Sequence, residues 1–401
     1  MQIPVAKRGQ VEPFRAMEIL KVGNQLAQAG TPVYSLCLGQ PSTPAPQAVL
    51  EAAAAALRSH QIGYTDANGM PELRERISQH YRETYGAQVP ADRIVITTGS
   101  SAAFTAIFLA AFENGDTVAM TRPGYPAYRN TLAALGCKVD QIDCGPQTRW
   151  QPSVEQLQAR YRNQPAPKGL IIATPANPTG TVLPPSELAA IAKWCEENSV
   201  LLISDEIYHG ISFGPKCASL TQYSDKHVAV GSFSKYYSMT GWRLGWAVVP
   251  EPLVRPVEIL LGNLNLSAPT LSQLAAVTAF DTQATSELDS HVERYRENRQ
   301  VVLSTLEAIG AKTIAPADGA FYCYADISHL TSDTVNWCAE LLQSTGVALT
   351  PGVDFAPDSE AGDGLDPALD GSRYVRVSFA GATQQVQRGC ELLTQYVKDN
   401  H

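Results

Sequence analysis

The sequence contains no long apolar run and no segment built like a secretory signal peptide. No window approaches the roughly 18 consecutive apolar residues that a transmembrane helix requires. The first twenty residues, MQIPVAKRGQVEPFRAMEIL, include no continuous apolar stretch of the kind that directs secretion. We therefore expect a cytoplasmic protein without a membrane span.

The cysteines form no closely spaced pair. None of the eight belongs to a C-x-x-C motif, and no histidine cluster accompanies them, so we expect neither a metal site nor a redox dithiol. Their scatter is typical of buried thiols in a reducing compartment rather than of a disulfide framework. They are Cys37, Cys137, Cys144, Cys195, Cys217, Cys323, Cys338 and Cys390.

Basic clusters are also missing. Lysine and arginine total 30 against 39 acidic residues, and the formal net charge of −9 argues against nucleic acid or an anionic membrane as a partner. A local basic pocket for one small anion remains compatible with this balance. With 401 residues, of which 44% are hydrophobic and 17% charged, the chain should form a globular protein of two domains.

Short apolar runs alternate with amphipathic segments from about residue 45 to residue 250. Such runs predict strands buried on both faces, in a mainly parallel sheet covered by helices. They occupy 93–99, 116–122, 138–143, 169–175, 200–206, 227–234 and 244–250. After Pro269 the pattern changes to long helices and a few short strands, which predicts a smaller α+β domain. We assign residues 45–290 to the large domain, and residues 1–44 with 291–401 to a discontinuous small domain.

Polar residues follow several of these predicted strands. Because ligands bind at the carboxyl ends of strands in open parallel sheets, these residues should converge on one edge. Gly99-Ser100-Ser101 opens a helix after the first strand; the motif ANPTG, Asp205 with Tyr208, and Lys235 follow later strands.

Each motif also has an ordinary structural interpretation. A Gly-Ser-Ser at a helix start is more often a plain cap than an anion site, although Ser232 and Arg243 could complete a phosphate site there. NPTG has the composition of a β-turn. Asp205 could cap a turn, whereas a buried carboxylate would need a cationic partner such as a protonated ring nitrogen.

The stretch SFSKYYSMTGWRLGW places Lys235 directly after a strand, between serines and aromatic residues. Lysine is normally exposed, so a buried Lys235 needs a partner or a lowered pKa. A lysine, a phosphate site, a carboxylate for a pyridinium ring and a tyrosine together fit pyridoxal 5'-phosphate (PLP).

At this point the sequence resembles the class I and II PLP-dependent aminotransferases of fold type I, the aspartate aminotransferase superfamily. The resemblance covers nearly the whole chain and implies a large domain with a mainly parallel seven-stranded sheet, a smaller α+β domain and transfer of an amino group from an L-amino acid to a 2-oxo acid. The matching motifs occur in the expected order: LCLGQPSTP, YTDANGMPELR, TTGSSAA, RPGYPAY, TPANPTG, SDEIYHG, SFSKYYSMTGWRLGW and YVRVSF.

The resemblance also implies roles for individual residues. Lys235 would hold PLP as a Schiff base and act as the base, and Asp205 would pair with the pyridine nitrogen. Tyr208 and Asn177 would donate to the phenolic oxygen of the cofactor, and Tyr125 would stack on its ring. The phosphate would be held by Ser100, Ser101, Ser232 and Arg243, with the Gly99 turn allowing a close approach.

The substrate and the partner subunit follow from the same resemblance. Arg376 would bind the substrate α-carboxylate through two parallel hydrogen bonds, assisted by Asn177 and the backbone at Gly39. The enzyme would be a homodimer in which Tyr64 reaches the phosphate of the neighbouring subunit.

Three other functions share part of these motifs. SFSK matches the S-x-x-K motif of serine acyl-transferases, but their S-D-N and K-T-G motifs are missing. A nonenzymatic regulator of the same fold would carry an extra DNA-binding domain or would lack the lysine of the site, and this sequence shows neither feature. A PLP-dependent Cβ–S lyase remains an alternative, because elimination uses the same lysine, aspartate and arginine.

The choice of amino donor depends on position 101. In the aspartate-using members of the most similar subgroup a lysine can stand there and meet the distal carboxylate, whereas this chain has Ser101. The side chains of Arg8, Arg15, Arg122 and Arg129 cannot be placed from the sequence. We expect a neutral donor such as alanine, valine or an aromatic amino acid, with an aspartate-type aminotransferase as the alternative.

Overall fold

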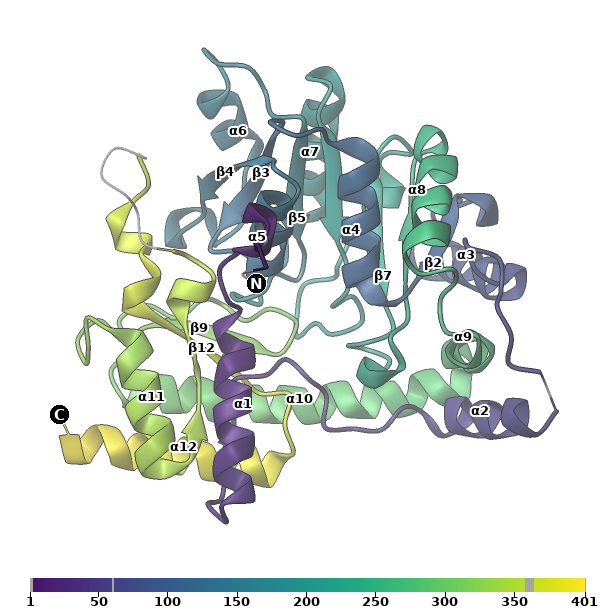
Figure 1. Ribbon diagram of the computed structural model, residues 1–401. Coiled ribbons are helices and arrows are strands. Elements are labelled where there is room, and N and C mark those ends of the chain that lie inside the picture. The colour runs from purple at the N-terminus through teal and green to yellow at the C-terminus, as the bar shows by residue number, and fades with distance from the viewer. Residues whose placement is uncertain (1–2, 60, 358–363, 401) are drawn as a thin grey trace.

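The computed structural model describes residues 3–59, 61–357 and 364–400. A seven-stranded sheet forms the centre of the larger part of the molecule (Figure 1). In spatial order its strands are β2 (Ile94–Thr97), β8 (Gly245–Val248), β7 (Val228–Ser232), β6 (Leu201–Asp205), β5 (Gly169–Ala173), β3 (Thr117–Arg122) and β4 (Lys138–Asp143). All are parallel except β8, which runs antiparallel to both β2 and β7.

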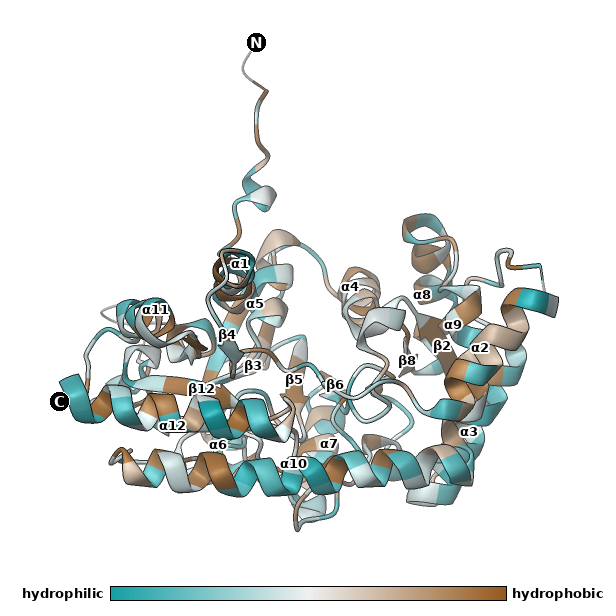
Figure 2. Ribbon diagram, turned by 90° about the horizontal axis from the view of Figure 1, so that it is seen from below, coloured by the Kyte–Doolittle hydropathy of each residue, from teal (hydrophilic) through white to brown (hydrophobic). Residues whose placement is uncertain are grey.

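Helices cover both faces of this sheet, as the continuous apolar strands require (Figure 2). One face packs against α4 (Gly99–Ala111), α5 (Pro126–Ala134) and α8 (Glu251–Leu264). The other packs against α2 (Gln47–Ser59), α3 (Pro71–Tyr85), α6 (Val154–Arg160), α7 (Pro185–Glu197) and α9 (Thr270–Ala276). Successive strand residues alternate between the two cores: Leu202 lies in one and Ile203 in the other.

The single antiparallel strand brings two connecting segments together, the one between β2 and α4 and the one between β7 and β8. Gly245, the first residue of β8, pairs with Thr97 at the end of β2 and with Ser232 at the end of β7. The loop before β8, which carries Lys235 and Arg243, therefore lies at the same edge as the start of α4.

The smaller part of the molecule contains a three-stranded antiparallel sheet of β11 (Thr350–Pro351), β12 (Tyr374–Ser378) and β9 (Tyr322–Asp326). A second, two-stranded sheet pairs β1 (Tyr34–Ser35) with β10 (Val347–Ala348) in parallel. The helices around them are α1 (Arg15–Gln28), α11 (Thr334–Thr345) and α12 (Thr383–Asn400).

One long helix, α10 (Thr282–Ala308), contributes to both parts (Figure 1). Its Leu288 lies in the core beneath the large sheet, and its Val302 and Leu306 lie in the core of the smaller part. The boundary expected between residues 290 and 291 falls inside this helix, and the division into domains remains a prediction.

The predicted fold class is confirmed: an α/β protein with a mainly parallel seven-stranded sheet and a smaller α+β part. Every expected strand of the large sheet is present, each within a few residues of its predicted range. The eight cysteines are unpaired, and all but Cys217 are buried. No helix among the described residues is both long and apolar enough to span a membrane.

Candidate active site

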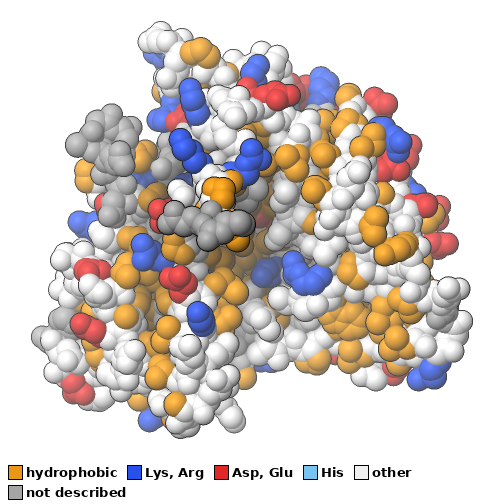
Figure 3. Space-filling model, in the orientation of Figure 1, with side chains coloured by type: hydrophobic (Ala, Val, Ile, Leu, Met, Phe, Trp, Pro, Cys, Tyr) orange, Lys and Arg blue, Asp and Glu red, His pale blue; other side chains and the backbone are white. Residues whose placement is uncertain are grey.

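The sequence motifs converge at the carboxyl edge of the large sheet, where it faces the smaller part. Figure 3 shows a hollow on this face, with lysine and arginine side chains at its edge. Asp205 ends β6, Ser232 ends β7, and Arg376 approaches from β12 of the smaller part. These side chains therefore lie together at one edge of the sheet, as the sequence led us to expect.

Lys235 lies within this convergence rather than on the outer surface. Its Nζ donates a hydrogen bond of 2.8 Å to the carbonyl oxygen of Gly39. Burial, together with the positive charges of Arg376 and Arg243, lowers the pKa of Lys235 to about 8, against the opposing effect of Asp205. An amine with this pKa is partly deprotonated near neutral pH and can act as a base.

Asp205 is a buried carboxylate that needs a cationic partner. It accepts hydrogen bonds from the backbone N–H of Ile207, at 3.1 Å, and from the hydroxyl of Tyr128. Burial nevertheless raises the pKa of Asp205 to about 6. A protonated ring nitrogen placed beside this carboxylate would hold it in the ionised form.

Gly99 and Arg243 form the predicted phosphate region at the first turn of α4. Gly99 has φ of +74°, and a Cβ on it would lie 2.4 Å from Nη2 of Arg243, so only glycine admits the guanidinium here. Arg243 donates to the carbonyl oxygen of Thr240 and forms no ion pair with a carboxylate of the described chain. Its charge and the helix N-terminus together suit a phosphate. Ser100, Ser101 and Ser232 belong to the same junction of α4, β7 and β8.

Arg376 is a buried cation with no acidic partner. It is 2% exposed, and within the described ranges no carboxylate approaches it to ion-pair distance. Nη1 donates to Oδ1 of Asn177 at 2.8 Å, and Nη2 donates to the carbonyl oxygen of Cys37 and to Oγ1 of Thr350. A buried guanidinium held only by neutral oxygens favours an anionic ligand such as a carboxylate.

Two further predicted residues lie beside these groups. Tyr208 is buried, with its ring centroid 5.9 Å from Nζ of Lys235. Tyr125 contacts Tyr128 and Phe14 edge to ring at 5.3 and 5.8 Å, and burial raises the pKa of Tyr125 to about 12. Burial also raises the pKa of Tyr208, so both phenols stay protonated near neutral pH and can donate hydrogen bonds.

Tyr64 does not join this group within its own chain. It is 82% exposed, on the segment between α2 and α3, and no described hydrogen bond or ring contact connects it to the other predicted residues.

Two residues that contact this group were not assigned a role from the sequence. Tyr128 contacts Asp205, and Phe355 lies against Arg376, as Tyr322 also does. Only Tyr128 had a sequence signal, as the second tyrosine of RPGYPAY, three positions after Tyr125. The residues present fit PLP: Lys235 as an amine, Asp205 for the ring nitrogen and Arg243 for the phosphate. The individual roles remain predictions.

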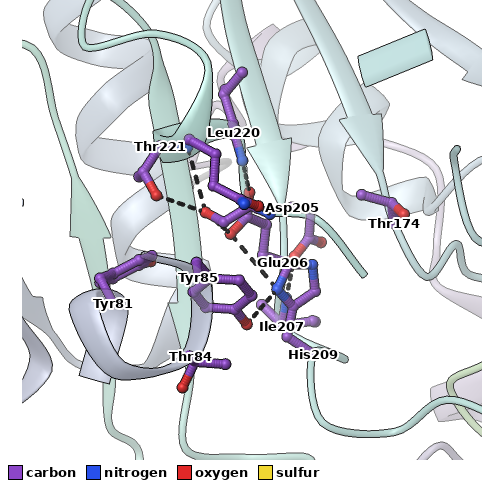
Figure 4. A network of polar contacts seen from close by, with 12 residues as sticks. Tyr81, Thr84, Tyr85, Thr174, Asp205, Glu206, Ile207, His209, Leu220 and Thr221 are labelled. Carbon is purple, nitrogen blue, oxygen red and sulfur yellow. Dashed lines mark hydrogen bonds and ion pairs between the residues drawn. The ribbon is translucent and has the colours of Figure 1, made fainter. Parts of the chain in front are cut away.

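A second buried carboxylate, that of Glu206, lies next to Asp205 and belongs to a network of polar contacts (Figure 4). It accepts hydrogen bonds of 2.8 Å from Oγ of Ser219 and from the backbone N–H of Leu220. Nδ1 of His209 lies 3.7 Å from Glu206 and 2.8 Å from the hydroxyl of Tyr85. These contacts hold the turn between Asp205 and Tyr208 against α3.

Glu206 should make stability depend on pH. Burial raises the pKa of Glu206 to about 7, from a usual value of 4.5. Between these values the folded protein binds a proton that the unfolded chain has released, so this group lowers stability as pH rises. In urea titrations of the apoprotein, the free energy of unfolding should fall between pH 5 and pH 8 by about 1–3 kcal/mol less in Glu206→Gln than in wild type. The control is Glu197→Gln, at an exposed position. If the free energy of unfolding of Glu206→Gln depended on pH as it does in wild type, the raised pKa of Glu206 would be refuted.

Comparison with known proteins agrees with this chemistry. Residues 31–393 match the family described as Aminotransferase class I and II. Valine--pyruvate aminotransferase of Mycobacterium tuberculosis is 49% identical over 385 residues, which are 96% of each chain. Aspartate/prephenate aminotransferase of Thermus thermophilus is 30% identical over 95% of each chain.

A solved structure gives the same result for the fold. The crystal structure of an aminotransferase from Mycobacterium tuberculosis superimposes with a TM-score of 0.93 at 46% sequence identity, covering 99% of this chain and 100% of that one.

Proposed function

This chain belongs to the class I and II aminotransferases and is a PLP-dependent enzyme, and from that membership we propose that its amino donor is a neutral L-amino acid such as valine or alanine, with pyruvate or 2-oxoglutarate as acceptor. The observation that carries the donor class is the uncharged side chain of Ser101 in the first turn of α4, where aspartate-using relatives can carry a lysine. The four arginines that the sequence left unplaced contact other groups or solvent in the described ranges. Arg122 is fully buried against Asp143, Arg15 pairs with Asp354, and Arg129 donates to the carbonyl oxygen of Asp354. Arg8 is exposed in the N-terminal segment.

The relatives support the same donor class. The relative that is 49% identical is named for valine and pyruvate, and the aspartate/prephenate aminotransferase is 30% identical. Leaving the distal carboxylate of aspartate desolvated and unpaired costs about 1–3 kcal/mol, or roughly ten- to hundredfold in discrimination.

In the proposed mechanism the chain's own residues bind, orient and move a proton. When bound, PLP supplies an electron sink for the charge that develops at the donor α-carbon. Arg376 binds the α-carboxylate and orients the α-carbon toward Lys235. Nζ of Lys235, with its pKa lowered to about 8, removes the proton from the donor α-carbon. The same group then donates that proton in the next step, which completes the transfer of the amino group. Asp205 keeps the ring nitrogen protonated, and Tyr208 with Asn177 donates to the phenolic oxygen.

Donor preference is directly measurable. Values of kcat/KM for alanine, valine, phenylalanine and aspartate with one common acceptor should rank a neutral donor first, roughly ten- to hundredfold above aspartate. Aspartate in first place would overturn the proposed donor class. Release of pyruvate and ammonia from cystathionine, in an assay to which no 2-oxo acid acceptor is added, would instead indicate the Cβ–S lyase.

A matched variant sharpens this test. Ser101→Lys, assayed with saturating PLP, should raise kcat/KM for aspartate relative to valine, because a cation then stands where aspartate-using relatives can carry one. Thr105→Lys, one turn further along α4, is the control that adds the same charge away from the site.

We also propose a homodimer in which Tyr64 completes the partner's site. Tyr64 lies in an exposed apolar region with Ile62, Leu264 and Leu266, which are 43, 54 and 55% exposed. The two segments are adjacent, because Oγ of Ser267 accepts from the N–H of Thr65. An exposed apolar region of this kind favours a subunit interface.

The unpaired thiols are in keeping with the expected cytoplasmic location.

Complementation between inactive subunits tests the dimer. Mixing Lys235→Ala with Tyr64→Phe should produce hybrids in which one site combines intact Lys235 with the partner's intact Tyr64. Activity above that of either parent is the expected result. A monomer in light scattering at micromolar concentration would refute the dimer.

A further inference from the structure

Tyr322 is the side chain that contacts both halves of the site, the cofactor-facing tyrosine and the carboxylate-binding arginine. Its hydroxyl lies 2.8 Å from the hydroxyl of Tyr208. Its ring centroid lies 4.4 Å from Cζ of Arg376. Tyr322 is 2% exposed, so neither contact competes with solvent.

The backbone around Tyr322 holds it in this position. Tyr322 is on β9 and Arg376 is on β12, and the register pairs Ser378 with Tyr322 and Arg376 with Tyr324. Tyr322 and Arg376 are therefore diagonal neighbours on adjacent strands, within reach of each other on one face. A Cβ on Gly39 would lie 1.5 Å from the hydroxyl of Tyr322, so the glycine leaves room for that hydroxyl.

We propose that Tyr322 is a positioning residue with two separable actions: its hydroxyl polarises Tyr208 toward the cofactor, and its ring fixes the plane of the Arg376 guanidinium for the substrate carboxylate. The inference does not depend on which amino acid is the donor.

The hydroxyl action follows from hydrogen counting. A phenol has one hydrogen to donate. If Tyr208 donates to the phenolic oxygen of PLP, the bond between the two tyrosines must run from Tyr322 to Tyr208. Burial raises the pKa of Tyr322, so its proton stays in place. A donor that itself accepts a hydrogen bond is polarised and donates more strongly.

The ring action follows from the packing of Arg376. Tyr322 and Phe355 both lie against the guanidinium, with centroids 4.4 and 4.7 Å from Cζ. Stacked aromatic rings restrict a planar cation to one orientation and attract it electrostatically. The hydrogen bonds to Asn177 and Thr350 then fix the direction of its nitrogens.

Two substitutions separate these actions. Tyr322→Phe removes only the hydroxyl. It should raise the pKa of the bound cofactor, measured by titrating its visible absorption, by about 0.5 unit. KM for the amino donor should stay within about twofold of wild type. Tyr322→Leu also removes the ring and should raise that KM roughly three- to thirtyfold. The groups that face Tyr208, and could otherwise move this titration, are Asp205, Lys235, Tyr128, Tyr322 and Arg376.

Tyr324→Phe is the matched control. Tyr324 is buried on the same strand, stacks on Tyr374, and its hydroxyl has no hydrogen-bond partner among the described residues. It should change neither the titration nor KM.

The outcomes are decisive in both directions. A wild-type titration curve in Tyr322→Phe would overturn the hydroxyl action, and an unchanged KM in Tyr322→Leu would overturn the ring action. A raised KM in Tyr322→Phe equal to that of Tyr322→Leu would show that the two actions are not separable. The absorption titration needs no amino donor, so an error in the proposed donor class would leave its result intact.

Discussion

Lys235→Ala should bind PLP yet lose transamination by several orders of magnitude. The substitution removes both the covalent attachment and the base, whereas Arg243, Asp205 and the start of α4 remain to hold the phosphate and the ring. Single-turnover spectroscopy with the amino donor measures the loss. Lys226→Ala, at an exposed lysine that pairs with Glu196, should retain full activity.

The attachment itself can be located chemically. The purified protein should be yellow, and borohydride should leave a pyridoxyl group on the peptide that contains Lys235. Label on any other lysine, or on none, would contradict the assignment of Lys235.

Arg376→Ala should leave the absorption spectrum of the bound cofactor intact while kcat/KM for the amino donor falls roughly 30- to 1,000-fold, mainly through KM. The reason is the uncompensated charge: Arg376 is buried among neutral oxygens and binds nothing acidic in the described chain. Arg376→Lys should recover only part of the loss, because an ammonium cannot form two parallel hydrogen bonds to a carboxylate.

The control for Arg376 lies nearby in the sequence. Arg373 pairs with Asp326 at 3.2 Å, so its charge is already compensated, and Arg373→Ala should alter KM by no more than about twofold. Loss of PLP from Arg376→Ala would assign that arginine to the cofactor rather than to the substrate.

The large sheet and its catalytic edge could be predicted from the sequence because both depend on local patterns. Continuous apolar runs such as LLISD and VAVGS can be buried only between two layers of helices, and the rule for parallel sheets then places Asp205 and Lys235 at one edge. The same rule placed Gly99 beside that edge, although the contact with Arg243 required the antiparallel β8.

The rest of the site depends on contacts between segments far apart in the chain. Tyr322 and Phe355 meet Arg376 through the pairing of short strands in the smaller part, and no local pattern specifies that pairing. The partners of Arg122 and Arg129 were equally hidden, because both are tertiary contacts. Tyr64 stands apart within one chain, so its predicted role would require a second copy of the chain.

The position of β8 between β2 and β7 has a consequence for how the protein is made. Thr97 and Gly245 pair directly although they are 148 positions apart in the chain. During synthesis the apolar strand β2 therefore has no strand to pair with until β8 has emerged from the ribosome. We expect a nascent chain stopped before residue 245 to be prone to aggregation and to associate with chaperones. Docking of β8 also sets Arg243 against Gly99, so the strand of the large sheet that is synthesised last is the one that completes the predicted phosphate region.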